Sequence, residues 1–278
     1  MNRFLLVSTL GAVFLVLLSG SAQTPSRDEN WTRCQDNNPD LSIGACTALI
    51  ESSAESPANR ATAFHNRGDR YLRKGEGDKA IADYDAAIRL KPDDAVAFNN
   101  RGDAYLDRGE YDKAAADFDA AIRLNPDYVG AFNRRGYSNL FAGRFAVAAS
   151  DFQKSMGLGA TGPYSVLWLH LARARSAQDD AQELSRNAAS LDLKVWPGPV
   201  VAFFLGQMNA EQVKAAANSD AKTQHERNCV ASFFLGEKVL LDGKAGEAER
   251  LFLQSRETCP PGFIQYQGAQ SELKRMGR

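Results

Sequence analysis

Small and aromatic residues recur along this chain with a period that predicts pairs of short helices. Residues 61–94 and 95–128 are identical at 24 of 34 positions, and a more divergent copy covers residues 129–162. In the first copy we expect one helix from Ala61 to Lys74 and a second from Asp78 to Leu90. Pro92 cannot continue the second helix, so it separates one copy from the next.

The repeated pattern continues more weakly after residue 162. Helices are expected over residues 164–175 and 181–189, and residues 202–206 are echoed by residues 232–236. A last amphipathic helix is expected from Phe263 to Met276, with Glu272, Lys274 and Arg275 facing water. These segments predict an all-α chain with five parts: a signal peptide (1–22), an N-terminal capping half-repeat (23–60), three repeats (61–162), degenerate helical repeats (163–228), and a final repeat with a capping helix (229–278).

The signature positions of the copies resemble the tetratricopeptide repeat family. The small and large residues of its pattern stand in register twice, as Gly68, Tyr71, Ala80, Tyr84, Ala87 and Pro92, and as Gly102, Tyr105, Ala114, Phe118, Ala121 and Pro126. The resemblance implies a right-handed superhelix, or α-solenoid, of antiparallel helix pairs with a C-terminal capping helix. Within a pair, we expect Gly68 and Ala80 to face one another where the two helices cross.

The four cysteines fall at informative positions of this repeat register. Cys34 takes the place of Gly68 and Cys46 that of Ala80, while Cys229 begins the first helix of the last repeat and Cys259 ends its second helix. The register therefore predicts the disulfides Cys34–Cys46 and Cys229–Cys259, one near each end of the solenoid. Four free, buried thiols are the alternative.

The first residues of the chain predict export. A short positive region at Arg3 precedes an apolar run from Phe4 to Leu18, and small residues from Gly20 to Ala22 suit a signal peptidase. We therefore expect a periplasmic protein, with an uncleaved membrane anchor as the alternative. The formal net charge of −1 provides no strong field for nucleic acid, so nucleic-acid binding is not expected.

The second half of the chain resembles the NlpI-type lipoproteins of bacterial envelopes. The resemblance rests on residues 165–172, on Trp196 before residues 200–206, and on residues 233–236. It implies a dimeric scaffold that brings peptidoglycan hydrolases to a processing protease, although this chain lacks the lipidated cysteine. A structural subunit of a secretion or pilus assembly and a hydrolase are the alternatives, and homodimerisation around Trp196 stays open.

Three short motifs resemble those of enzymes, but each is incomplete. Residues 157–162 match GxGxxG, yet they follow a helix rather than a strand. The sequence from His225 to Cys229 begins like HExxH without its second histidine, and Ser271 and Lys274 have SxxK spacing without partner motifs. We therefore predict a non-enzymatic protein without a metal or cofactor.

A partner is expected on the concave face, which the first helices of successive repeats would line. Asparagine side chains offer donors and acceptors to an extended peptide, so Asn66, Asn100 and Asn133 would form a ladder, with Tyr137 and Phe141 supplying apolar area. Some relatives grip a C-terminal carboxylate, but Asp69 would repel one, so no such clamp is expected. The predicted partner-binding residues are His65, Asn66, Asp69, Asn99, Asn100, Asp103, Asn133, Arg134, Tyr137 and Phe141.

Overall fold

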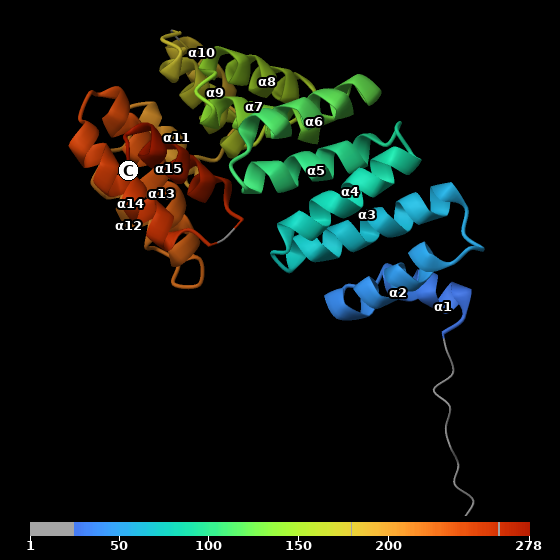
Figure 1. Cartoon of the computed structure of the whole chain (residues 1–278). Helices are drawn as coiled ribbons and strands as arrows, with labels where there is room; N and C mark the ends of the chain where they lie inside the picture. The colour runs from blue at the N-terminus through green and yellow to red at the C-terminus, as the bar shows by residue number, and fades with distance from the viewer. Residues whose placement is uncertain (1–24, 179, 261) are drawn as a thin grey trace, which may run out of the picture.

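The computed structural model describes residues 25–178, 180–260 and 262–278, and these residues are organised as helices and their connections (Figure 1). The predicted signal peptide, residues 1–22, lies outside the described residues. The prediction of an all-α repeat solenoid is confirmed.

Four antiparallel helix pairs form the N-terminal stack, coloured blue to green in Figure 1. Helix α3 begins four residues before the expected start, because Ser56 caps it and Pro57 fits its first turn. Each pair packs against the next along the stack. The pairs are α1 (Arg27–Cys34) with α2 (Pro39–Glu51), α3 (Pro57–Arg73) with α4 (Gly77–Leu90), α5 (Ala95–Asp107) with α6 (Tyr111–Leu124), and α7 (Val129–Phe141) with α8 (Phe145–Gly157).

The C-terminal part is less regular and lies beside the α5–α7 end of the stack in Figure 1. Its longest pair is α13 with α14, in the region where the register predicts a final repeat. The echoed segments differ in structure, since residues 202–206 end a short helix while residues 232–236 lie within a long one. The helices are α9 (Pro163–Arg175), α10 (Ala181–Ala188), α11 (Gly198–Phe204), α12 (Ala210–Ala217), α13 (Gln224–Leu241), α14 (Ala245–Thr258) and α15 (Ile264–Arg275).

A glycine lies against an aromatic ring at the crossing of each regular pair. A Cβ added to Gly102 would lie 2.8 Å from the Phe118 ring, and one added to Gly68 would lie 2.9 Å from the Tyr84 ring. Gly136 and Gly236 meet rings in the same way. At Gly68, the atoms nearest to the missing side chain belong to the ring sixteen residues later, that of Tyr84.

A repeated arginine joins the helices of one pair and also joins successive pairs. Arg101 donates to both oxygens of Asp117 at 2.8 and 2.6 Å, and to Asp85 of the preceding repeat at 2.5 Å. Arg135 pairs with Asp151 and Asp119 in the same way. Arg67 pairs with Asp83, but its contact with the preceding helix pair is to the hydroxyl of Thr47, at 2.8 Å. This arginine ladder is a device that sequence reasoning missed, although its residues recur every 34 positions.

Both predicted disulfides are present. Cys34–Cys46 closes the α1–α2 hairpin, and Cys229–Cys259 joins the first turns of α13 to the end of α14, each with Cα atoms 4.7 Å apart. The two bonds therefore fix a hairpin at each end of the described chain.

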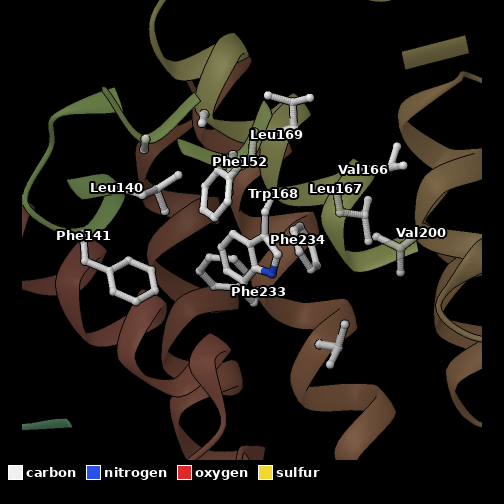
Figure 2. Close-up of a cluster of buried hydrophobic side chains, with 14 of the residues drawn as sticks. Leu140, Phe141, Phe152, Val166, Leu167, Trp168, Leu169, Val200, Phe233 and Phe234 are labelled. Carbon is white, nitrogen blue, oxygen red and sulfur yellow. The ribbon is translucent and has the colours of Figure 1, made fainter. Parts of the chain in front are cut away.

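The largest buried cluster joins the stack to the C-terminal helices. Trp168 of α9 is 1% exposed, and its ring lies 5.3 Å from that of Phe233 and 5.2 Å from that of Phe234 (Figure 2). Glu272 is 2% exposed, so the expectation that it faces water is wrong. Arg175 explains its burial, since Nη1 lies 2.6 Å from Glu237 and 3.1 Å from Glu272, and so ties α9 to α13 and α15. Burial and the charge of Glu272 raise the pKa of Glu237.

Candidate partner-binding face

The residues that we predicted for partner binding all lie on α3, α5 and α7, the first helices of three successive repeats. Helix α3 packs against α5 and α5 against α7, so these helices form one surface, the α3–α5–α7 face (Figure 1). The structure brings some of the predicted residues together and buries others. The predicted set is His65, Asn66, Asp69, Asn99, Asn100, Asp103, Asn133, Arg134, Tyr137 and Phe141.

Asn100 connects the first two helices of this face. Its amide nitrogen lies 3.1 Å from Oδ1 of Asp69 and 3.2 Å from Nε2 of His65. The hydroxyl of Tyr84 donates to the same Asp69 oxygen at 2.7 Å, so Asp69 accepts from two sides. Burial and the charge of Asp69 raise the pKa of Tyr84, which therefore stays a donor. Three predicted residues thus share one network with Tyr84, whose ring also fills the Gly68 crossing.

An open cavity of about 220 Å³ lies beside this network. Asp103 of α5 and Asp69 of α3 both line it, and Leu72 contributes apolar wall. Arg134 of α7 places Nε 3.2 Å from Oδ1 of Asp103 while its own side chain stays 44% exposed. Burial raises the pKa of Asp103 to about 6, and the pair with Arg134 offsets only part of that effect.

The predicted asparagine ladder is wrong in its register. Arg134, not Asn133, stands 34 residues after Asn100, and one residue along a helix turns the side chain by about 100°. Asn133 is instead the counterpart of Asn99, which is 8% exposed and donates to Oδ1 of Asn100. At the other end of the ladder, the Asn66 amide lies 3.8 Å from Sγ of Cys34, against the disulfide. Of the three asparagines of the predicted ladder, Asn100 is the one among the residues that line the cavity.

The predicted apolar end of the face is also wrong, because the C-terminal helices cover it. Phe141 is 4% exposed and packs close to Gly268 of α15. Tyr137 is half-buried, with its ring centre 5.1 Å from that of Trp168, and burial raises its pKa to about 12. Phe141 belongs to the buried cluster of Figure 2, and Tyr137 packs against that cluster.

Helix α15 contributes one residue to the face that no local pattern indicated. Gln267 is 6% exposed, and its amide nitrogen donates to Oδ1 of Asp107 at 2.6 Å, across 160 residues of sequence. Burial also raises the pKa of Asp107. The face therefore ends at α15, beyond Asp107.

Within the described part of the chain, no group of three or more His, Cys, Asp or Glu side chains is placed to hold a metal ion. Over the same residues, none of the helices has the length and apolar character that crossing a membrane requires. The partial motifs at His225 and Ser271 lie on α13 and α15, two helices of the C-terminal part.

Comparisons with known proteins give the class that this geometry indicates. The tetratricopeptide repeat family model matches residues 65–129 and 99–163. A crystal structure of a tetratricopeptide repeat protein from Parabacteroides merdae has a TM-score of 0.61 at 15% identity, covering 88% of this chain and 96% of that one. The crystal structure of MamA has a TM-score of 0.51 at 20% identity, covering 59% of this chain and 93% of that one. The protein is an α-solenoid in which residues 65–163 match tetratricopeptide repeats.

A curated relative supports the narrower resemblance. The chain is 27% identical over 118 residues to the "Lipoprotein NlpI homolog" of Haemophilus influenzae, covering 41% of this chain and 38% of that protein. The match thus spans less than half of the length of this relative. It supports a likeness to the NlpI type, and the repeats themselves indicate a protein–protein interaction scaffold.

Proposed function

We propose that this protein is a non-enzymatic adaptor of the bacterial envelope that binds an extended segment of another protein on its α3–α5–α7 face. The observation that carries the proposal is the open cavity between α3 and α5, where Asp69, Asn100 and Asp103 present polar atoms at one place. Stacked repeats are suited to such a role, because they offer a long surface to which each repeat adds similar positions.

Two features support a place in the envelope. Disulfides persist mainly in oxidising compartments, and both cysteine pairs of this chain are bonded. The resemblance to an envelope lipoprotein points to the same place. The periplasm is therefore our proposed location.

We propose cell-wall hydrolases or a protease as the partners, by resemblance to the NlpI type. Dimerisation is the second part of that resemblance. Trp196 is the residue we propose for it, and in the described chain this side chain is half-buried under the guanidinium of Arg227, 5.8 Å from its ring centre.

Capture of partners from the native envelope tests the proposal. The tagged protein is crosslinked mildly in cells and purified, and the proteins bound to it are identified by mass spectrometry. We expect Asn100→Ala with Arg134→Ala to lose the captured partners without unfolding, since both side chains reach the surface of the face. The control is Arg123→Ala with Glu257→Ala, two exposed residues of α6 and α14. Equal capture by both double variants would place the binding surface elsewhere.

A further inference from the structure

A second open cavity lies at the junction between the capping hairpin and the first repeat, where α3 begins and α4 ends beside α2 (Figure 1). It has a volume of about 250 Å³, and we call it the α2–α4 cavity. It shares no lining residue with the cavity between α3 and α5, so it is a separate feature of the surface. Its lining residues are Ile50 of α2, Arg60 and Phe64 of α3, and Ala86, Arg89 and Leu90 of α4.

The charge of this cavity is positive and is not balanced from within. Arg60 and Arg89 line it, and none of the described residues that line it is acidic. Over the described part of the chain, neither guanidinium forms an ion pair or a hydrogen bond. Nε of Arg60 is buried without a hydrogen-bond partner. Because folded proteins leave few buried donors unpaired, this atom indicates an acceptor that is supplied from outside.

The acidic residues near the two arginines in sequence do not supply that acceptor. Glu51 and Asp93 are exposed, and neither pairs with Arg60 or Arg89. The others are engaged elsewhere: Glu55 pairs with Arg27, Asp85 pairs with Arg101, and Asp94 caps α5. A negatively charged group of another molecule would therefore be the first to neutralise the two guanidiniums.

The rest of the cavity wall is apolar. Ile50, Phe64 and Leu90 are each half-buried, so part of each stays accessible, and Ala86 is 9% exposed. Pockets that enclose a whole small molecule usually measure about 300–1,000 Å³, so a cavity of about 250 Å³ is better suited to one large side chain. A carboxylate next to an aliphatic side chain therefore matches both the charge and the walls.

The repeat register explains why this chemistry occurs at the first repeat. The position of Arg60 is taken by Asp94 in the next repeat, where the carboxylate caps α5. Helix α3 is instead capped by Ser56, four residues before Arg60. Position 60 is thereby released from capping and carries a cation. The pair of arginines is therefore a feature of this junction and is not repeated along the stack.

We propose that the α2–α4 cavity binds a partner polypeptide through a large aliphatic side chain that adjoins an acidic residue. The aliphatic side chain would enter between Ile50, Phe64 and Leu90, and the carboxylate would pair with Arg60 and Arg89. Guanidinium groups suit this task, because their planar donors match the two oxygens of a carboxylate. The proposal goes beyond the proposed function, since it places a second contact outside the predicted partner-binding residues.

Peptides that differ only at their centre test this assignment. Short peptides with varied, uncharged flanking sequences are N-acetylated and C-amidated, and each is made in four versions, with Leu-Glu-Leu, Leu-Gln-Leu, Leu-Lys-Leu or Ala-Glu-Ala at the centre. They are screened as an array against the purified protein, and those that bind are measured in solution by fluorescence anisotropy. Sodium laurate is titrated separately as an anionic, apolar probe that is not a polypeptide.

We expect Leu-Glu-Leu versions to bind at least about tenfold more tightly than Leu-Gln-Leu versions, because charge-assisted hydrogen bonds are roughly twice as strong as neutral ones. Ala-Glu-Ala versions should bind at least about tenfold more weakly than Leu-Glu-Leu, because they bury less apolar area. Equal binding of glutamate and glutamine versions, or no binding by any glutamate version, would overturn the proposal. Binding of laurate without binding of any peptide would overturn the assignment to a polypeptide.

Charge variants locate the site. Arg60→Gln with Arg89→Gln should remove the preference for glutamate, while far-UV circular dichroism shows that the fold is kept. The matched control, Arg123→Gln with Arg186→Gln, makes the same change of charge at two exposed arginines in the last turns of α6 and α10 and should keep the preference. Loss of the preference in both double variants would mean that net charge alone controls binding, and the proposal would fail.

A filled cavity gives an independent test that leaves both arginines in place. Ala86→Leu should block the cavity and abolish binding of the Leu-Glu-Leu peptides. Its control is Ala120→Leu, at the same position of the next repeat and also 9% exposed, which should bind as the parent does. Unchanged binding by Ala86→Leu would place the peptide elsewhere and overturn the proposal.

Capture from the native envelope separates this proposal from the proposed function. If Asn100→Ala with Arg134→Ala abolishes partner capture but peptides show no preference for glutamate, the adaptor function stands and only the α2–α4 assignment fails. If the peptides show the expected preference but that double variant keeps all its partners, the α2–α4 assignment stands and the α3–α5–α7 face is not the binding surface.

Discussion

The glycine at each helix crossing leads to a prediction that can be worked out quantitatively, and Gly102 is the best position to test it. A Cβ at this position would lie 2.8, 2.9 and 3.1 Å from three atoms of the Phe118 ring. That ring is fully buried, so it has no free space into which it can turn. Gly44, inside α2, makes a matched control because an added Cβ would meet nothing within 4 Å.

The two glycines should respond to alanine with opposite signs. Replacing a helical glycine by alanine stabilises a protein by about 0.5–1 kcal/mol, and Gly44→Ala should gain this amount. Gly102→Ala gains the same term, but overpacking a dense core costs about 1–3 kcal/mol. We expect Gly102→Ala to range from neutral to about 2 kcal/mol less stable than the parent, and Gly102→Leu to lose more.

Urea denaturation followed by far-UV circular dichroism measures both variants under the same conditions. The informative quantity is the difference in free energy of unfolding between Gly44→Ala and Gly102→Ala. The gain in helix propensity is the same in both variants and cancels, so this difference, about 1–3 kcal/mol, is the cost of overpacking at Gly102. Equal stabilisation by Gly102→Ala and Gly44→Ala would refute the reasoning, since it would mean that the Phe118 ring yields without cost.

Three further predictions follow from the ladder, the disulfides and the cavity. Arg101→Met should lower the free energy of unfolding, measured by urea denaturation, by about 3–5 kcal/mol, because it leaves the buried carboxylate of Asp117 unpaired. Adding Asp117→Leu to this variant should recover much of the loss. Replacing Cys229 and Cys259 by serine should lower the free energy of unfolding by about 4 kcal/mol, and replacing Cys34 and Cys46 should lower it by about 3 kcal/mol. The difference arises because Cys229–Cys259 closes a loop of 30 residues and Cys34–Cys46 a loop of 12. An equal loss of melting temperature in the two variants would contradict this entropic account. Asp103 should make the free energy of unfolding depend on pH, because burial raises its pKa to about 6, with a smaller opposing effect from the charge of Arg134 and a smaller supporting effect from that of Asp107. A raised pKa means that this group stabilises the fold below about pH 4 and that its contribution is lost as the pH rises through 6. Asp103→Asn should therefore flatten the pH dependence of the free energy of unfolding measured by urea denaturation, and an unchanged dependence in that variant would exclude Asp103 as the titrating group.

Features within one repeat could be predicted from the sequence because each depends on local geometry. The pairing of Cys34 with Cys46 followed from the positions of Gly68 and Ala80, since one hairpin has the same shape as the next. The helix ends at residues 90 and 124 likewise followed from the prolines two residues later. Repeating units transfer such information along the chain.

Features that depend on the curvature of the whole solenoid could not be predicted in this way. Phe141 stands at a position that faces outward in the register, yet α15 returns to cover it. Glu272 has the pattern of a surface residue, but Arg175 lies 97 residues earlier and was not visible as its partner. Small rotations at each repeat add up to the overall curvature, and no single residue encodes their sum.

The arginine ladder makes the length of the stack adjustable. Arg135 contacts Asp119 of the repeat before it, just as Arg101 contacts Asp85. If residues 95–128 were deleted, Arg135 would meet Asp85 in place of Asp119 and keep Asp151, while Arg67 would keep its contacts with Asp83 and Thr47. The interior of this protein can therefore grow or shrink by whole repeats in evolution or by design, whereas the contacts that α15 makes with α5 and α7 fix where the stack must stop.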